Sequence, residues 1–356
     1  SSRSAKRDAI AELLGRLEAD EVEPVVGFLV GQPRQGRIGV GWRTLASAER
    51  PPASSPTLTV GEVDRTLDQL AALAGPGSGN ARLEVLGRLL GRATADEASF
   101  LARLLGGELR QGALEGVMAD AVARAASLPP AVVRRAMMLG GRLDTTARLA
   151  LHGGRAALAA VGLEVGRPVQ PMLASTAASV HEAVEAIGLA SVEWKLDGIR
   201  VQVHRDGDRV GVWTRNLNDV TDRLPGVVAA VRALPARRVV LDGEALGIDA
   251  TGRPRLFQDT VGRRGGSGEG APENGDRTDG YLRPFFFDVL HVDGEDLIDA
   301  PLSERLATLG ELAPGSRIPS QLTDDPAVGE LVLAEALAAG HEGVVVKAAA
   351  STYEAG

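Results

Sequence analysis

The stretch VEWKLDGIRVQVHRDGDRVGVWTR, residues 192–215, decides the fold of the second half of this chain. Apolar and polar residues alternate along it, and a period of two is typical of strands with one buried face. The dipeptide Asp206-Gly207 interrupts the alternation and is a common turn signal between antiparallel strands. The stretch therefore predicts a β-hairpin.

More strands are indicated further along the chain, in RRVVLDGEALGID, RPFFFDVLHVDG and EGVVVKA. Residues 328–340, VGELVLAEALAAG, are typical of an amphipathic helix. Residues 262–280 are rich in glycine and polar side chains, which predicts a mobile surface loop.

Residues 1–165 are predicted to be helical. Alanine, leucine and arginine dominate there, and apolar residues recur at steps of three and four, as in ARLEVLGRLLGRAT. The stretch GRPVQPMLA, residues 166–174, is typical of a linker. The fold class is therefore α+β, with an all-helical domain at 1–165 and a mainly antiparallel-sheet domain at 166–356.

The helical half contains a faint internal repeat. LVGQPRQGRI, residues 29–38, matches LGGELRQGAL, residues 105–114, at an offset of 76 residues. Arg34 and Arg110 are equivalent in this alignment, and glycine beside such an arginine lets the backbone approach a phosphate. Coincidence in a sequence of low diversity is an equally good interpretation.

Composition excludes several classes of protein. The 356 residues include no cysteine, so disulfides, thiolate nucleophiles and Cys-ligated zinc are excluded. The N-terminus has no apolar signal segment and no stretch reaches membrane-spanning length, so a cytoplasmic location is expected. The net charge of −8 is uneven: residues 1–165 hold 20 basic and 18 acidic residues, and the rest hold 19 and 29.

Lysine is rare in this chain. Of 39 basic residues only Lys6, Lys195 and Lys347 are lysines, which leaves 36 arginines. Arginine does not lose its proton in proteins, whereas lysine becomes a nucleophile when it does. A lysine kept within EWKLDGIR, residues 193–200, is what amine chemistry would require, although a lone lysine on a strand is usually a solvated side chain.

The neighbours of Lys195 favour an anionic ligand. On a strand, side chains two residues apart share a face, so Glu193, Lys195 and Asp197 are expected on one side, with Gly198 giving room beside them. The alternative is an ion-paired surface strand. The five histidines are isolated and offer no metal-ligand spacing, and no P-loop sequence occurs.

The pattern K-x-D-G-x-R at 195–200 resembles the nucleotide-attachment motif of the covalent nucleotidyltransferases: ATP-dependent DNA ligases, RNA ligases and mRNA capping enzymes. WTRN at 213–216, LDGE at 241–244, FFFDVLHVDG at 285–294 and EGVVVK at 342–347 resemble the next motifs, in family order. GRPVQPMLA resembles the lead-in of the DNA-ligase branch. The helical half resembles the DNA-binding domain of the same ligases.

The resemblance implies a role for each matching residue. Lys195 would attack the α-phosphate of ATP to form lysyl-AMP, and Lys347 would contact the same phosphate. Glu193 would accept a hydrogen bond from the adenine amino group, and Phe287 would lie against adenine. Arg200 and Arg215 would contact phosphate or ribose, Glu244 would contact the ribose or a metal, and Glu342 would bind Mg²⁺.

Each of these residues also has a plainer interpretation. The arginines are common surface residues, Glu193 would suit a salt bridge, and Lys347 would suit a solvated strand end. Phe285 and Phe287 share one face of a strand and Phe286 takes the other, so at least one phenylalanine is expected in a core.

The resemblance implies a monomeric DNA ligase that seals nicks in double-stranded DNA with ATP and Mg²⁺, in the cytoplasm at the nucleoid, in replication, repair or recombination. The chain ends inside the second domain by this comparison. We therefore expect weak adenylation and no unaided sealing.

Three alternatives remain open at this stage. An RNA ligase or a capping-type nucleotidyltransferase shares the motifs, and a non-catalytic DNA-binding scaffold shares the fold. A Schiff-base lysine enzyme is the third, although the surrounding carboxylates and arginines suit phosphates better.

Overall fold

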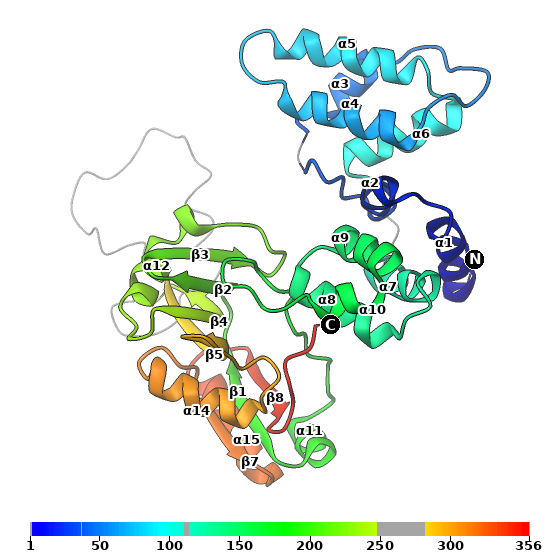
Figure 1. The fold of residues 1–356 in the computed structure, drawn as a ribbon. Coiled ribbons are helices and arrows are strands. Elements are labelled where there is room, and N and C mark those ends of the chain that lie inside the picture. The colour runs from blue at the N-terminus through cyan, green and yellow to red at the C-terminus, as the bar shows by residue number, and fades with distance from the viewer. Residues whose placement is uncertain (1, 37, 110–113, 248–281, 356) are drawn as a thin grey trace, which may run out of the picture. The chain divides into compact units, whose positions relative to one another are not determined.

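The protein divides into two compact units, Ser1–Gly162 and Leu163–Gly356. The structure is a computed structural model that describes residues 2–36, 38–109, 114–247 and 282–355 (Figure 1). The loop predicted at 262–280 lies outside the described residues. Across the described ranges, no helix is both long enough and apolar enough to span a bilayer.

The first unit is helical, as predicted. Its helices are α1 (Arg3–Leu14), α2 (Ala19–Val30), α3 (Trp42–Ser47), α4 (Val60–Ala72), α5 (Ser78–Leu90), α6 (Ala95–Gly106), α7 (Leu114–Ala125), α8 (Pro130–Gly140), α9 (Leu143–Arg148), the π-helical turn η1 (Leu149–Gly153) and α10 (Gly154–Ala159).

These helices enclose two hydrophobic cores. Val22 and Val26 of α2 pack with α1 and with α7 to α10. Phe28, on the same helix, packs instead with α4, α5 and α6, where Leu67 and Leu86 are fully buried. Helix α2 therefore contributes to both cores of the unit.

The internal repeat has a structural counterpart at two helix ends. Gly31 ends α2 and Gly107 ends α6, both in the left-handed conformation with φ of 72°. This conformation is easy for glycine and satisfies the last helix carbonyls. Arg34 pairs with Asp64 at 2.6 Å and also with Asp68, whereas Arg110 lies outside the described residues.

The second unit is built on two antiparallel sheets. Its elements are α11 (Val180–Ile187), β1 (Ala190–Lys195), β2 (Ile199–Asp206), β3 (Arg209–Thr214), the 3₁₀ turn η2 (Thr221–Arg223), α12 (Pro225–Arg232), β4 (Arg238–Leu246), β5 (Arg283–Val292), β6 (Glu295–Asp296), α14 (Leu302–Leu312), β7 (Ser320–Thr323), α15 (Pro326–Ala338) and β8 (Gly343–Ala348). The strand orders are β7-β1-β8 in the small sheet and β3-β2-β4-β5-β6 in the large sheet. The α+β class is confirmed.

The predicted hairpin consists of β2 and β3, with Gly207 in the turn at φ of 61°. The stretch before it behaves differently, because β1 ends at Lys195 and pairs with β7 and β8 in the small sheet. The quoted stretch therefore supplies strands to both sheets.

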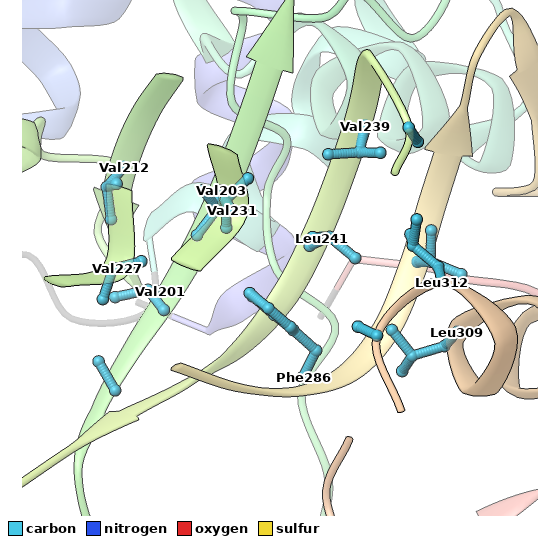
Figure 2. Packing of buried hydrophobic residues seen from close by; sticks show 14 of the residues in the cluster. Val201, Val203, Val212, Val227, Val231, Val239, Leu241, Phe286, Leu309 and Leu312 are labelled. Carbon is cyan, nitrogen blue, oxygen red and sulfur yellow. The ribbon is translucent and has the colours of Figure 1, made fainter. Parts of the chain in front are cut away.

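One face of the large sheet forms the main core of this unit. Val201 and Val203 of β2, Leu241 of β4 and Phe286 of β5 point into it, and α12 and α14 cover it (Figure 2). Because side chains alternate along a strand, the polar residues between these positions lie on the opposite face.

A bulge in β5 changes the alternation near the phenylalanines. Asp242 is opposite Asp288, but the next residue, Gly243, is opposite Phe286, so Phe287 is the extra residue. Phe286 is buried in the main core, and Phe285 and Phe287 pack together elsewhere, as the sequence predicts.

The stretch 166–174 has no regular secondary structure, but it is bound to the large sheet. Gln202 accepts a hydrogen bond from the backbone N–H of Val169 at 2.7 Å and donates one to its carbonyl at 3.1 Å. The backbone N–H of Gly166 donates to Nδ1 of His204 at 2.9 Å. The predicted linker is therefore a packed segment of the second unit.

Candidate functional site

Lys195 is the last residue of β1, and its side chain is 51% exposed. Its ammonium pairs with the carboxylate of Glu342, which directly precedes β8. The backbone joins the same residues, because the N–H of Glu342 donates to the carbonyl of Lys195 at 3.2 Å. The small sheet thus presents an accessible amine whose only ion-pair partner among the described residues is the carboxylate that directly precedes the neighbouring strand.

The residues after Lys195 are arranged differently from the expectation. Asp197 lies beyond the end of β1, so it does not extend the face of Glu193 and Lys195. Gly198 packs closely against β4: a Cβ there would lie 2.5 Å from the carbonyl oxygen of Ala245. Close approach of two backbones, rather than room for a ligand, accounts for this glycine.

Glu193 is buried and has two partners. Lys347 of β8 donates to it at 2.6 Å, and the hydroxyl of Ser191 donates to its other carboxylate oxygen at 3.0 Å. The salt-bridge interpretation of Glu193 is therefore realised in this structure. Two of the predicted ligand-binding residues, Glu193 and Lys347, contact each other directly.

Phe287 lies beside two cations. Nζ of Lys347 is 4.4 Å from the ring centroid, and the guanidinium carbon of Arg200 is 5.4 Å from it. Both distances are within the range of cation–π contacts. The ring also packs against a small apolar cluster with Leu196 and Leu246, so it contacts both apolar and charged side chains.

Arg200 and Glu244 are directly opposite each other on β2 and β4. Arg200 forms two hydrogen bonds with Asp242, from Nε at 3.2 Å and from Nη2 at 2.8 Å. Burial raises the pKa of Glu244 to about 7, against the lowering effect of Arg200 and Lys195. Glu244 therefore titrates near neutral pH, and added positive charge would favour its carboxylate form.

Arg215 directly follows β3, at the same end of the β2–β3 pair as Arg200, because Val201 is opposite Thr214. It is exposed in the turn after β3 and has no ion-pair partner within the described part of the chain. The structure brings Lys195 together with Glu342, and Glu193 together with Lys347 and Phe287.

Sequence reasoning missed the buried residues behind the site. Tyr353 donates to Asp242 at 2.7 Å, and Arg305 holds Asp288 through two bonds of 2.7 and 3.0 Å. Asp242 lies within the LDGE motif, but nothing local in the sequence marks its partners, which are 42 and 111 residues away.

The two predicted metal ligands are Glu244 and Glu342. Among the described residues there is no group of three or more His, Asp or Glu side chains suited to a metal ion. Carboxylate oxygens are the ligands that Mg²⁺ prefers, and this ion commonly takes its other ligands from water and substrate phosphates.

This arrangement, with a strand-end lysine between two antiparallel sheets, defines the class of covalent nucleotidyltransferases. The family profile described as "ATP dependent DNA ligase domain" matches residues 171–356, and the profile "DNA ligase N terminus" matches residues 43–123. The chain therefore belongs to the family of ATP-dependent DNA ligases.

Relatives along the whole chain agree. Proteins named "Probable DNA ligase" from Saccharopolyspora erythraea and Pseudarthrobacter chlorophenolicus are 52% and 53% identical over 355 residues, which is 100% of this chain and 68% of each relative. A solved structure named "Pmar-Lig_Pre." is similar in fold, with a TM-score of 0.59 and 18% identity, over 100% of this chain and 72% of that one. Membership in the DNA-ligase branch separates the chain from RNA ligases and capping enzymes.

Proposed function

We propose that this chain carries out the lysine adenylation that precedes nick sealing, with Lys195 as the nucleophile. One observation supports this proposal more strongly than the others. The amine of Lys195 is accessible at the end of a strand, beside Glu342 and close enough to Glu244 to affect its pKa. An accessible amine among carboxylates and arginines suits a phosphate substrate that arrives with a cation.

The proposed step forms one bond and breaks one. Lys195 first loses a proton to water, and the lone pair of Nζ then attacks the α-phosphorus of ATP. The N–P bond forms as the bond from the α-phosphorus to the bridging oxygen breaks, and pyrophosphate leaves. The product is a lysyl-AMP phosphoramidate.

Residues near Lys195 would hold the nucleotide. Phe287 offers a ring for adenine, and each oxygen of Glu193 can accept a second hydrogen bond, here from the adenine amino group. Lys347 and Arg200 carry positive charge beside that ring and would contact phosphate oxygens. Arg215 is exposed and would contact phosphate or ribose.

Glu244 and Glu342 would hold Mg²⁺ together with the substrate phosphates. The bound ion would neutralise charge that develops on the phosphate oxygens. Glu342 would have to exchange its pairing with Lys195 for the metal, and this exchange would also free the amine.

In the later steps, AMP would pass to the 5′-phosphate of nicked double-stranded DNA, and the adjacent 3′-hydroxyl would displace it. The helical unit would bind the duplex, and a nucleoid location would follow from that substrate.

Peptide mass spectrometry after incubation with ATP and Mg²⁺ tests the proposal. We expect one added AMP on the peptide that contains Lys195, and none in Lys195→Arg, which keeps the charge but not the nucleophile. Lys6→Arg is the matched control and should label like the wild type. AMP on another residue, or label on Lys195→Arg, would contradict the assignment. Labelling by GTP in place of ATP would point to a capping-type activity instead.

A further inference from the structure

Tyr353 places a buried hydroxyl directly behind the site. Its side chain is 1% exposed, and the phenol donates to Oδ2 of Asp242 at 2.7 Å. The same oxygen atom of the phenol accepts a hydrogen bond from the backbone N–H of Met172 at 3.1 Å. The hydroxyl therefore donates one hydrogen bond and accepts another.

Asp242 transmits this contact to Arg200. Its Oδ2 accepts from Tyr353 and also from Nη2 of Arg200, while Oδ1 accepts from Nε of Arg200. A carboxylate held by a third bond cannot turn freely about its last side-chain torsion. The plane of the guanidinium follows the plane of the carboxylate, because the two groups are joined at two points.

The segment that carries Tyr353 is itself fixed by main-chain bonds. After β8, the N–H of Ala349 donates to the carbonyl of Leu189, and the N–H of Ser303 donates to the carbonyl of Ala349. The N–H of Tyr353 donates to the carbonyl of Ile298 at 3.0 Å. The phenol thus extends from an anchored segment that runs from the small sheet to the large one.

The phenol remains a donor throughout the ordinary pH range. Burial and the neighbouring carboxylate of Asp242 both raise the pKa of Tyr353 well above its usual value. Arg200 keeps Nη1 outside its two bonds to Asp242, and its side chain is 19% exposed. A part of the Arg200 side chain is therefore open to a ligand.

We propose that Tyr353 is a positioning residue that holds Arg200, through Asp242, in the orientation needed at the phosphates of ATP. This inference rests on the proposed adenylation by Lys195. It adds a residue outside the five motifs and links the end of the small sheet to a cation of the large sheet.

The first test needs no activity. Nε–H of Arg200 donates to Asp242, so NMR should show a slowly exchanging side-chain signal, assigned by its loss in Arg200→Lys. In Tyr353→Phe, which keeps the ring, we expect exchange of this proton to be about tenfold faster. Ser351→Ala is the control, because its hydroxyl bonds only to the nearby carbonyl of Ala348 and exchange should stay unchanged.

The second test measures lysyl-AMP formation. Tyr353→Phe should lower the rate at saturating ATP by about tenfold to a hundredfold, with less than about threefold change in KM, because a misplaced group costs most in the transition state. In an Arg200→Lys background the same change should have little further effect. Asp242→Asn should weaken the same link and serves if Tyr353→Phe unfolds.

The outcomes separate the two proposals. If exchange and rate in Tyr353→Phe match those of Ser351→Ala, or if the losses in Tyr353→Phe and Arg200→Lys simply add, the positioning role is wrong. If the wild type forms no lysyl-AMP, the proposed function fails, and proton exchange at Arg200 still decides whether Tyr353 holds it.

Discussion

Asp242 and Asp288 are directly opposite each other in the β4–β5 ladder, and both carboxylates are buried. Each is bound at two points by its own arginine, Arg200 for Asp242 and Arg305 for Asp288. Two adjacent buried carboxylates would repel each other, so the two arginines are needed to neutralise them. Arg200 faces the site, whereas Arg305 is only 1% exposed and bonds to the backbone as well.

Arg305→Met is expected to destabilise the second unit without touching the site. It leaves Asp288 buried and unpaired, which typically costs about 3–5 kcal/mol. Urea unfolding followed by fluorescence of Trp194 and Trp213, in a Trp42→Phe background, measures the free energy of unfolding.

Two further variants make the result specific to that ion pair. Adding Asp288→Asn to Arg305→Met should recover part of the loss, because no buried charge is then left alone. Arg238→Met breaks an exposed pair with Asp206 and should change the stability by about 0.5 kcal/mol or less. Equal losses in Arg238→Met and Arg305→Met would contradict the proposed cause.

Lys347→Met should separate a structural role from a ligand role. Glu193 is then buried with only Ser191 as a partner, so stability should fall by about 2–4 kcal/mol. Lys347→Met with Glu193→Gln should recover stability, because the buried charge is gone. Adenylation should stay at least tenfold low in both, since the cation beside Phe287 is missing. Recovery of adenylation in the double variant would show that Lys347 acts only on stability.

Local features of the structure could be predicted from the sequence, and distant partners could not. The turn at Gly207 and the opposite faces of Phe286 and Phe287 follow from alternation over a few residues. The bond between Lys347 and Glu193 joins residues 154 apart, because β8 pairs with β1 across most of the unit. Strand pairing at such separations is not encoded in any local pattern.

One expectation about the strand face of Lys195 was wrong. Asp197 was expected on the strand face of Lys195, but the chain leaves the small sheet at Lys195 to enter the large one at Ile199. The bulge at Phe287 in β5 is a further feature that strict alternation does not predict.

His204 is expected to make the stability of the second unit depend on pH. Its Nδ1 accepts from the N–H of Gly166, so its proton lies on Nε2, which donates to Gln202 at 2.9 Å. Burial, and less so nearby His291, lower the pKa of His204 from 6.5 to about 3. The unfolded state therefore binds more protons between these values, and stability is lost as the pH falls below 6.5.

The loss from His204 should reach about 2 kcal/mol between pH 7 and pH 5. Urea unfolding at several pH values measures it, and His204→Gln should show a shallower pH dependence. His181→Gln removes an exposed histidine of α11 and should leave the slope of the wild type. An identical slope in His204→Gln and the wild type would mean that His204 is not the titrating group.

Gly198→Ala tests whether the close packing of the nucleotide-attachment motif against β4 positions Lys195. The added methyl group would meet the carbonyl oxygen of Ala245 at 2.5 Å and Leu246 at 2.9 Å, and a backbone oxygen cannot easily give way. We expect a loss of about 1–3 kcal/mol in stability and a slower adenylation rate, because β2 must move away from β4. Gly315→Ala is the matched control, since nothing lies within 4 Å of its added methyl group, and it should behave like the wild type. Unchanged adenylation in Gly198→Ala would show that the loop after Lys195 tolerates displacement, and that the glycine serves folding alone.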